Sequence, residues 1–218
     1  QYTGVDLGVI GIMNYKFPMN RHIVEVSGLE AGKEYLYRVG DASRNWWSEV
    51  GTFKMADGSE ETSFVHICDP QSQSEQQYET FSKVIAKAYE MYDSDFIINT
   101  GDNVDHGDNF RQWQWLFNTA SDTLMDTVMM SASGNHENYG SYAIEKNYYY
   151  SNVPEQDTKS GIYFSFDYNN VHVAVLNTND LNDDESLGDA QVEWLIDDMQ
   201  SSDADWKFVA FHKAIYSN

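Results

Sequence analysis

From residue 62 onward, short apolar runs alternate with stretches of helical periodicity. Strands are predicted at 62–68, 95–99, 128–132, 162–166, 171–176 and 206–211, the fourth and fifth forming a hairpin. Apolar residues recur at helical spacing from Tyr78 to Tyr92, Phe110 to Ala120 and Val192 to Met199. Strands that alternate with helices in this way predict an α/β fold with a mainly parallel sheet.

Residues 1–58 have no helical periodicity and read as short strands separated by Gly, Asn and Pro. The stretch 29–37 resembles the corner of a fibronectin type III or immunoglobulin-like domain, where a tyrosine hydroxyl bonds to the upstream backbone. Such a domain needs about 100 residues, so 1–58 is predicted to be part of one. The polar stretch 56–61 is the predicted joint, and 62–218 the α/β domain.

Charge limits the possible partners. The chain has 35 Asp and Glu against 13 Lys and Arg, a net charge of −22, and no basic stripe, so no nucleic-acid-binding surface is expected. An anionic substrate would need a local positive charge such as a metal ion. The single cysteine, Cys68, excludes an intrachain disulfide and lies in an apolar run that predicts a buried thiol. No apolar run is long enough to span a membrane.

Polar residues follow four of the predicted strands. Asp69 follows the first, Asp102 the second and Asn135 the third, at intervals of 33 residues, and His212 follows the last. Ligands of open parallel sheets bind beyond the carboxyl ends of the strands, so these side chains can meet in one crevice. Gly-Asp alone is a weak signal because it occurs four times, but Gly-Asn-His-Glu occurs once, after an apolar strand.

Two carboxylates, an amide oxygen and an imidazole are a ligand set that suits Zn, Mn or Fe. A carboxylate that offers both oxygens can bridge two ions, and such a pair would hold a phosphoryl group and generate hydroxide near neutral pH. The set therefore predicts a centre of two divalent or trivalent transition metals.

The order Asp, Gly-Asp, Gly-Asn-His-Glu and a strand-end His resembles the calcineurin-like metallophosphoesterase superfamily, and with the β part before it the chain is similar to bacterial relatives of purple acid phosphatases. The resemblance implies a β-α-β sandwich fold. It also implies that Asp69 binds the first metal, Asp102 bridges, and Asn135 and His212 bind the second. His136 would protonate the leaving group or stabilise the transition state.

Several positions depart from the family pattern. Asp105 stands where the purple enzymes have a tyrosine, and Gln71 where many relatives have a ligand histidine. Gly-Asp-x-Val-Asp-x-Gly resembles the protein serine/threonine phosphatase branch, which has a phosphate-binding arginine at the position of His106. His106 is therefore either a substrate contact or a polar loop residue. The Gly-His-x-His motif is absent, so we expect a chain truncated at both ends.

The expected function is hydrolysis of phosphomonoesters or phosphodiesters, small or macromolecular, by a metal-bound hydroxide at a dinuclear centre. The resemblance implies an extracellular or cell-surface protein. The alternative is a non-catalytic cell-surface or assembly protein built on a phosphoesterase scaffold. Outside this site, His66 and His172 are predicted to be core histidines, and Glu137 is predicted to support its turn rather than to take part in chemistry.

Overall fold

Two three-stranded sheets form the centre of the molecule. The computed structural model describes residues 2–12, 15–140 and 162–214. The first sheet has the parallel order β7 (Phe64–Ile67), β8 (Phe96–Asn99), β9 (Val128–Ser131). The second has the order β10 (Phe164–Tyr168), β11 (Val171–Val175), β12 (Trp206–Ala210), with β10 antiparallel and β12 parallel to β11. The predicted α/β fold and hairpin are confirmed.

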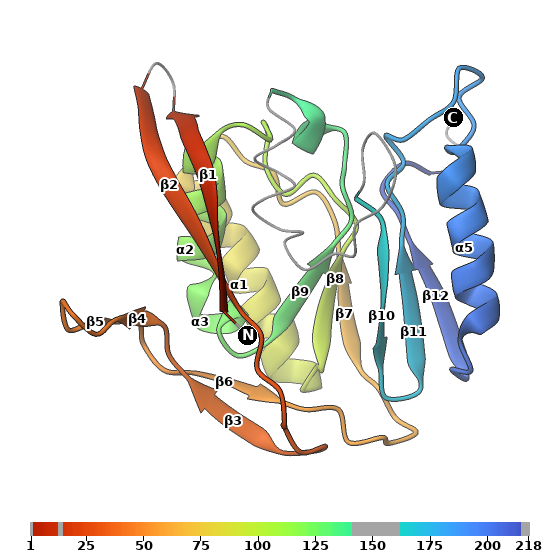
Figure 1. The fold of residues 1–218 in the computed structure, drawn as a ribbon, viewed down its shortest axis with the longest axis horizontal. Coiled ribbons are helices and arrows are strands. Elements are labelled where there is room, and N and C mark those ends of the chain that lie inside the picture. The colour runs from red at the N-terminus through yellow and green to blue at the C-terminus, as the bar shows by residue number, and fades with distance from the viewer. Residues whose placement is uncertain (1, 13–14, 141–161, 215–218) are drawn as a thin grey trace.

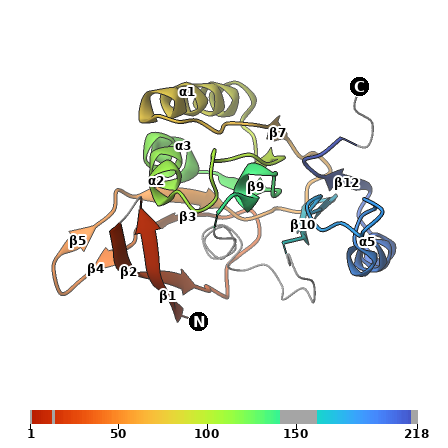
Figure 2. The ribbon, with the colours of Figure 1, turned by 90° about the horizontal axis from the view of Figure 1, so that it is seen from above.

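Helices cover the outer faces of both sheets (Figures 1 and 2). The helices α1 (Glu75–Tyr92), α2 (Phe110–Thr119) and α3 (Ser121–Leu124) lie against the first sheet, and α5 (Asp189–Ser201) lies against the second. A short 3-10 helix, η1 (His136–Asn138), follows β9. In the described part of the chain, every helix is too short or too polar to traverse a bilayer.

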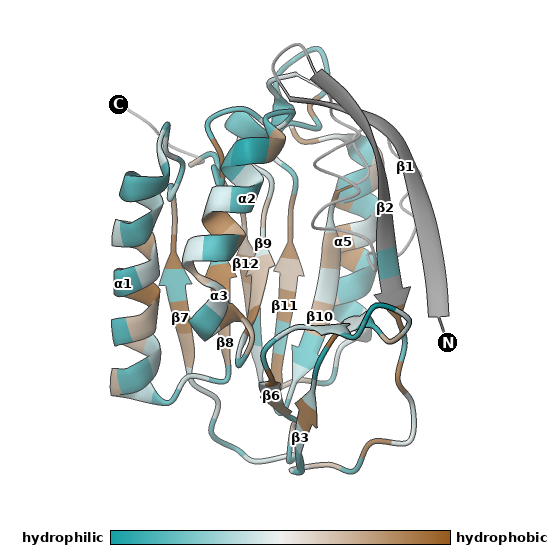
Figure 3. Ribbon diagram, turned by 90° about the vertical axis from the view of Figure 1, so that its left-hand side faces the viewer, coloured by the Kyte–Doolittle hydropathy of each residue, from teal (hydrophilic) through white to brown (hydrophobic). Residues whose placement is uncertain are grey.

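Apolar side chains fill two spaces, one between the first sheet and its helices and one between the two sheets. Trp113 is fully buried in the first, where its indole N–H donates to the Gly107 carbonyl at 2.8 Å, and Trp115 and Phe117 pack against that cluster. Phe96 lies in the second, stacked on Phe64 at a ring-centroid distance of 5.2 Å. Apolar residues are concentrated in the strands (Figure 3). The central strands β8 and β11 are buried along their whole length, as expected for strands covered on both faces.

The described residues before the joint form three two-stranded antiparallel sheets. They pair β1 (Tyr2–Ile12) with β2 (Tyr15–Val24), β3 (Glu34–Tyr37) with β6 (Gly51–Lys54), and β4 (Gly40–Asp41) with β5 (Trp46–Trp47). The Tyr35 hydroxyl accepts a hydrogen bond from the Glu30 backbone N–H at 2.8 Å, which is the bond predicted for the tyrosine corner. Assignment of 1–58 to a fibronectin type III-like domain, with its boundary, stays a prediction.

The β3–β6 pair is attached to the end of the sheets from which the parallel strands start (Figure 1). The carboxylate of Asp126, just before β9, accepts hydrogen bonds from the Thr52 backbone N–H at 2.8 Å and from its hydroxyl at 2.9 Å. Asn169, in the β10–β11 turn, accepts from the backbone N–H groups of residues 57 and 58. The carboxyl ends of the strands therefore lie at the opposite end from these contacts.

Two predictions about β7 are wrong. His66 and Cys68 are exposed rather than buried. Alternation along the strand puts Val65 and Ile67 against the helix side, and His66 on the other face. β7 is an edge strand, and among the described residues nothing covers this face of it at His66 and Cys68. The His66 ring lies 3.2 Å from the Thr100 hydroxyl.

His172 is a core histidine, as predicted. It is 4% exposed on β11, with Nδ1 at 2.8 Å from Asp167 Oδ1 and Nε2 at 2.8 Å from Asp198 Oδ2 on α5. The Ser165 hydroxyl also donates to Asp198, and the neighbouring Lys207 on β12 directs its ammonium to backbone carbonyls. Burial lowers the pKa of His172, but the hydrogen bonds to the two carboxylates outweigh it, so the net pKa is raised.

We predict that His172→Ala destabilises the protein more at acidic than at alkaline pH. The pKa of the folded state lies above the ordinary value of 6.5, so the pairing stabilises the fold fully below about pH 6.5 and this contribution is lost as pH rises through the folded-state pKa. Urea unfolding near pH 6 should show a loss of about 2–3 kcal/mol, because the partly buried Asp198 loses its ion pair with His172 and keeps the Ser165 hydroxyl as a donor, and a smaller loss near pH 9. His66→Ala is the control and should stay within about 0.5 kcal/mol at both pH values. An equal loss at both pH values in the His172 variant would contradict the prediction.

Candidate metal centre

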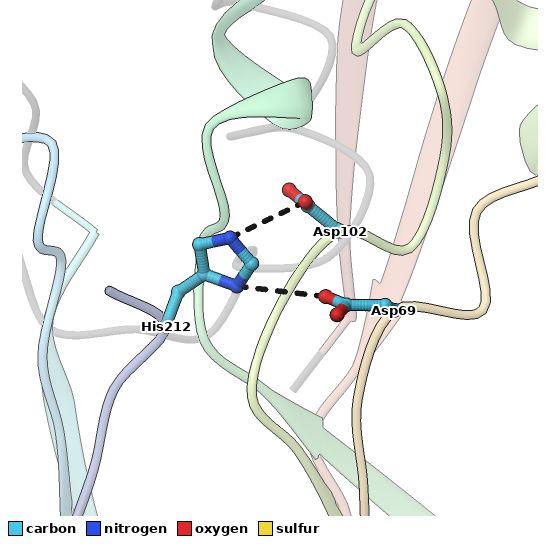
Figure 4. A group of neighbouring side chains, drawn as sticks. All are labelled: Asp69, Asp102 and His212. Carbon is cyan, nitrogen blue, oxygen red and sulfur yellow. Dashed lines mark ion pairs between the residues drawn. The ribbon is translucent and has the colours of Figure 1, made fainter. Parts of the chain in front are cut away.

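Four segments that follow parallel strands meet at one end of the sheets. Asp69 follows β7, Asp102 follows β8, Asn135 follows β9 and His212 follows β12. Ligand atoms of Asp69, Asp102 and His212 lie within 4.8 Å of one another, and one nitrogen of the imidazole faces each carboxylate (Figure 4). The amide oxygen of Asn135 joins them at 3.1 Å from His212 Nε2. The predicted convergence is therefore present in the structure.

The His212 ring has a defined orientation. Its Nδ1 lies 2.9 Å from the Thr100 carbonyl, which can only accept, so Nδ1 carries the hydrogen. Nε2 faces Asp102 Oδ2 at 3.2 Å and Asn135 Oδ1 at 3.1 Å. Nε2 thus has two oxygens beside it, whereas Asp69 Oδ1 lies 3.9 Å from Nδ1. The bond from Nδ1 to a carbonyl is the arrangement that fixes the binding nitrogen in metal-ligating histidines.

The two carboxylates stand on unusual backbone. Asp69 and Asp102 have φ values of 51° and 53°, in the left-handed region that few residues other than glycine adopt. The two turns hold each other there, because the Asp69 N–H donates to the Gly101 carbonyl at 3.2 Å and the Gln71 N–H donates to the Asp102 carbonyl at 2.9 Å. Backbone of this kind is retained where the surrounding structure determines it, as in binding sites.

Glycines allow the second and third segments to touch. Gly101 has a φ of 111°, and a Cβ placed on it would lie 2.7 Å from the Gly134 nitrogen. A Cβ on Gly134 would overlap the Asp102 carboxylate. Both positions therefore require glycine, which explains physically why Asp102 and Asn135 are each preceded by one.

Glu137 connects the segment after β8 to the segment after β9. It is 1% exposed, and its carboxylate accepts backbone N–H groups from Asp102 at 2.9 Å, Asn103 at 2.6 Å, Val104 at 3.2 Å and Gly134 at 2.7 Å. Burial raises the pKa of Glu137, and the N–H donors act against that rise without cancelling it. These bonds support the prediction that Glu137 holds the turn rather than reacting.

Electrostatics couples Asp102 to His212. Burial acts to raise the pKa of Asp102, but hydrogen bonds from His212 and from the His136 backbone N–H hold it below its usual range. The hydrogen bond to Asp102 raises the pKa of His212, and burial opposes the rise. The two shifts have the same meaning: the Asp102 carboxylate is stabilised in its negative form by a positive charge beside it. A bound cation would supply that charge in place of the His212 proton.

His136 lies beside the group of ligand atoms rather than within it. Its backbone N–H donates to Asp102 Oδ1 at 3.0 Å. Its ring Nδ1 lies 2.9 Å from the Asp105 carbonyl and 3.3 Å from the Asp105 carboxylate, which in turn accepts from the Gln73 amide at 3.3 Å. The Nδ1 hydrogen is thus committed to Asp105, and Nε2 is the nitrogen left for a substrate. Asp105 thus orders this loop through its contacts with His136 and Gln73.

His106 is exposed and stands apart from the three-residue group of possible ligands. Its backbone N–H donates to the side chain of Gln112 at 2.9 Å, and its ring contacts Tyr139. Both interpretations of His106, substrate contact and loop residue, are compatible with this position.

Gln71 carries a buried acceptor. Its Oε1 has no hydrogen-bond partner among the described residues. A buried oxygen without a donor is costly, and an amide oxygen is a hard ligand that a cation would satisfy. The unpartnered oxygen of Gln71 and the possible ligand atoms of Asp69, Asp102 and His212 fit the metal site that the sequence predicts.

Sequence reasoning missed three residues that shape the site. Asn99 is fully buried at the end of β8 and accepts the Gly101 N–H at 3.1 Å. Asn179, in the segment between β11 and α5, donates to the Gly134 carbonyl at 2.9 Å. Tyr139 contacts His136. Only Asn99 had a usable signal, because a buried polar residue that ends an apolar strand next to Gly-Asp indicates a structured turn.

Comparison with known proteins identifies the fold. Residues 62–218 match the family model described as calcineurin-like phosphoesterase. A similar solved structure is that of the purple acid phosphatase PPD1 isolated from yellow lupin (Lupinus luteus) seeds, with a TM-score of 0.73 and 19% sequence identity over 96% of this chain. The chain spans 43% of the lupin protein, and at this identity the likeness shows a shared fold. No curated protein matches the chain.

We predict that Glu137→Gln weakens both the fold and the site. The amide NH₂ of glutamine would face backbone N–H groups that now donate to a carboxylate oxygen, so urea unfolding should show a loss of about 2–4 kcal/mol. Glu79→Gln, on the exposed side of α1, is the matched control and should change stability by less than about 0.5 kcal/mol. Equal stability of the two variants would show that the four N–H contacts do not hold the loops together.

Proposed function

Because the chain belongs to the calcineurin-like phosphoesterase family, we propose that it hydrolyses phosphate esters at a metal centre. Asp69, Asp102, Asn135 and His212 would hold the metal. The observation that carries the proposal is the group of ligand atoms from Asp69, Asp102 and His212 within 4.8 Å of one another, at the end of the sheets where the parallel strands finish. A nonspecific acidic surface would not require the left-handed backbone and the close glycine contacts that place these atoms.

We propose that the centre holds two ions, of Zn, Mn or Fe, with Asp102 between them. Asp102 is suited to bridging because its two oxygens face different partners, Oδ2 toward His212 and Oδ1 toward the His136 backbone N–H. When bound, the ions would supply Lewis acidity and a water of lowered pKa. In a protein of net charge −22, they would also give the phosphate group a positive charge to bind.

His136 would give a proton to the leaving-group oxygen. Its Nδ1 is held by Asp105, so Nε2 is the only ring position that can exchange a proton with a substrate. The Asp105 carboxylate, at 3.3 Å from Nδ1, helps to fix the orientation of the ring. Because the His136 backbone is bonded to Asp102, the proton donor is held at a fixed place beside the metal ligands.

An extracellular or cell-surface location stays a proposal that rests on the family resemblance. The alternative of a non-catalytic protein on the same scaffold differs from an enzyme in one measurable respect, since it needs no bound metal. Metal content therefore separates the two functions before any substrate is known.

We predict that Asp102→Asn abolishes both metal binding and hydrolysis of a generic aryl phosphate. The substitution would remove the negative charge of a proposed metal ligand while keeping the shape of the side chain. Elemental analysis should give about two transition-metal equivalents for the wild type and few or none for the variant. Asp41→Asn changes the aspartate of another Gly-Asp pair, in β4, and should retain both properties.

Two outcomes would contradict this prediction. Undiminished hydrolysis by Asp102→Asn would remove the proposed centre. A wild-type protein that binds no transition metal would favour the non-catalytic alternative.

We predict that His136→Gln slows hydrolysis and leaves the metal content unchanged. Loss of a positioned proton donor lowers kcat by about 10²–10⁴-fold. The effect should be smaller for substrates with acidic leaving groups, which depart without protonation. Loss of metal from this variant would instead identify His136 as a ligand.

A further inference from the structure

An aromatic side chain lies between the two candidate histidines that do not belong to the group of metal ligands. The ring of Tyr139 has its centroid 4.8 Å from that of His136 and 5.5 Å from that of His106, tilted by 55° and 51°. The three rings come from two loops, His106 after β8 and the other two from the segment after β9. They form a short aromatic wall beside the proposed proton donor.

The wall also reaches the metal ligands. The Tyr139 hydroxyl accepts from the Asn135 amide at 3.4 Å, and the other end of that amide, Oδ1, lies 3.1 Å from His212 Nε2. A molecule held at the centre next to His136 would therefore lie close to the Tyr139 ring.

Tyr139 is not buried in either apolar cluster. It is 44% exposed, and His106 beside it is also exposed. An aromatic ring gains free energy when another aromatic ring packs offset or edge-on against it. The exposed part of Tyr139 is thus available for such a contact.

We propose that Tyr139, with His106, determines specificity by packing against an aromatic ring on the leaving group of the substrate. The inference rests on the proposed function, in which His136 protonates the leaving-group oxygen. The group attached to that oxygen must extend from His136, and Tyr139 is an aromatic side chain in ring contact with His136 in the described part of the chain. The substrate class is therefore phosphate esters of aromatic alcohols or of groups that carry an aromatic ring near the ester oxygen.

A purely structural role would depend on a different part of Tyr139. Its backbone carbonyl accepts from the Asp108 N–H at 3.3 Å, and its hydroxyl is bonded to Asn135. Tyr139→Phe keeps the ring and removes the hydroxyl, whereas Tyr139→Ala removes both. The two variants separate recognition by the ring from support of the loop by the hydroxyl.

The experiment compares two phosphonates that cannot be hydrolysed, with a methylene group in place of the ester oxygen. Calorimetry of the metal-loaded protein should show benzylphosphonate binding about fivefold tighter than ethylphosphonate. Tyr139→Ala should bring that ratio close to one, and Tyr139→Phe should keep it. Tyr92→Ala, at the end of α1 and 63% exposed, is the matched control and should leave the ratio unchanged.

A wild-type ratio near one, a ratio that survives in Tyr139→Ala, or failure of the protein to bind either phosphonate would overturn the inference. Turnover of an aryl phosphate is measured separately. If the ratio behaves as expected and no ester is hydrolysed, the proposed function fails and aromatic recognition by Tyr139 stands. If esters are hydrolysed and the ratio is near one, only the inference about Tyr139 fails.

Discussion

The carboxylate of Glu137 is the interaction on which the geometry of the site depends. It is buried, and it binds backbone N–H groups from both the segment after β8 and the segment after β9. Irregular backbone at a sheet end leaves N–H groups that the strands cannot satisfy, and each buried unpaired group costs about 1–3 kcal/mol. One carboxylate satisfies four of them. The two segments thereby become a single unit that can hold Asp102 and Asn135 next to each other.

Around this unit, hydrogen-bond acceptors outnumber the donors that face them. Asp69 and Asp102 bring negative charge together in a protein that is already strongly acidic, and His212 Nε2 faces two oxygens. Gln71 adds a buried oxygen with no described partner. Side chains selected for stability alone would pair acceptors with donors, or replace them with apolar groups of similar size. A surplus of hard ligands on rigid backbone is what a cation requires.

Periodicity and strand-end position predicted most of this arrangement, because both depend on local sequence. Strands and helices follow from apolar spacing, and residues directly after parallel strands share an edge whatever lies between them. Exposure was harder to predict, because it depends on the neighbouring layer. His66 and Cys68 lie on an edge strand, and on α5 the inner face carries buried Gln191 while Val192 is exposed. Tyr139 could not be found, since a ring contact between loops has no sequence period.

Asp102 links the proposed proton donor, His136, to the proposed metal ligand His212 through its two oxygens. Oδ1 accepts the His136 N–H, and Oδ2 faces His212, so the positions of His136 and His212 are set relative to one carboxylate. A change at Asp102 would therefore disturb metal binding and proton transfer together and could not distinguish them. His136 is bonded to this unit through its backbone, so its side chain can be altered without removing a ligand. For this reason metal content and turnover must both be measured on a variant of His136 as well as on a variant of Asp102. A His136 variant that keeps its metal but loses turnover would separate proton transfer from metal binding.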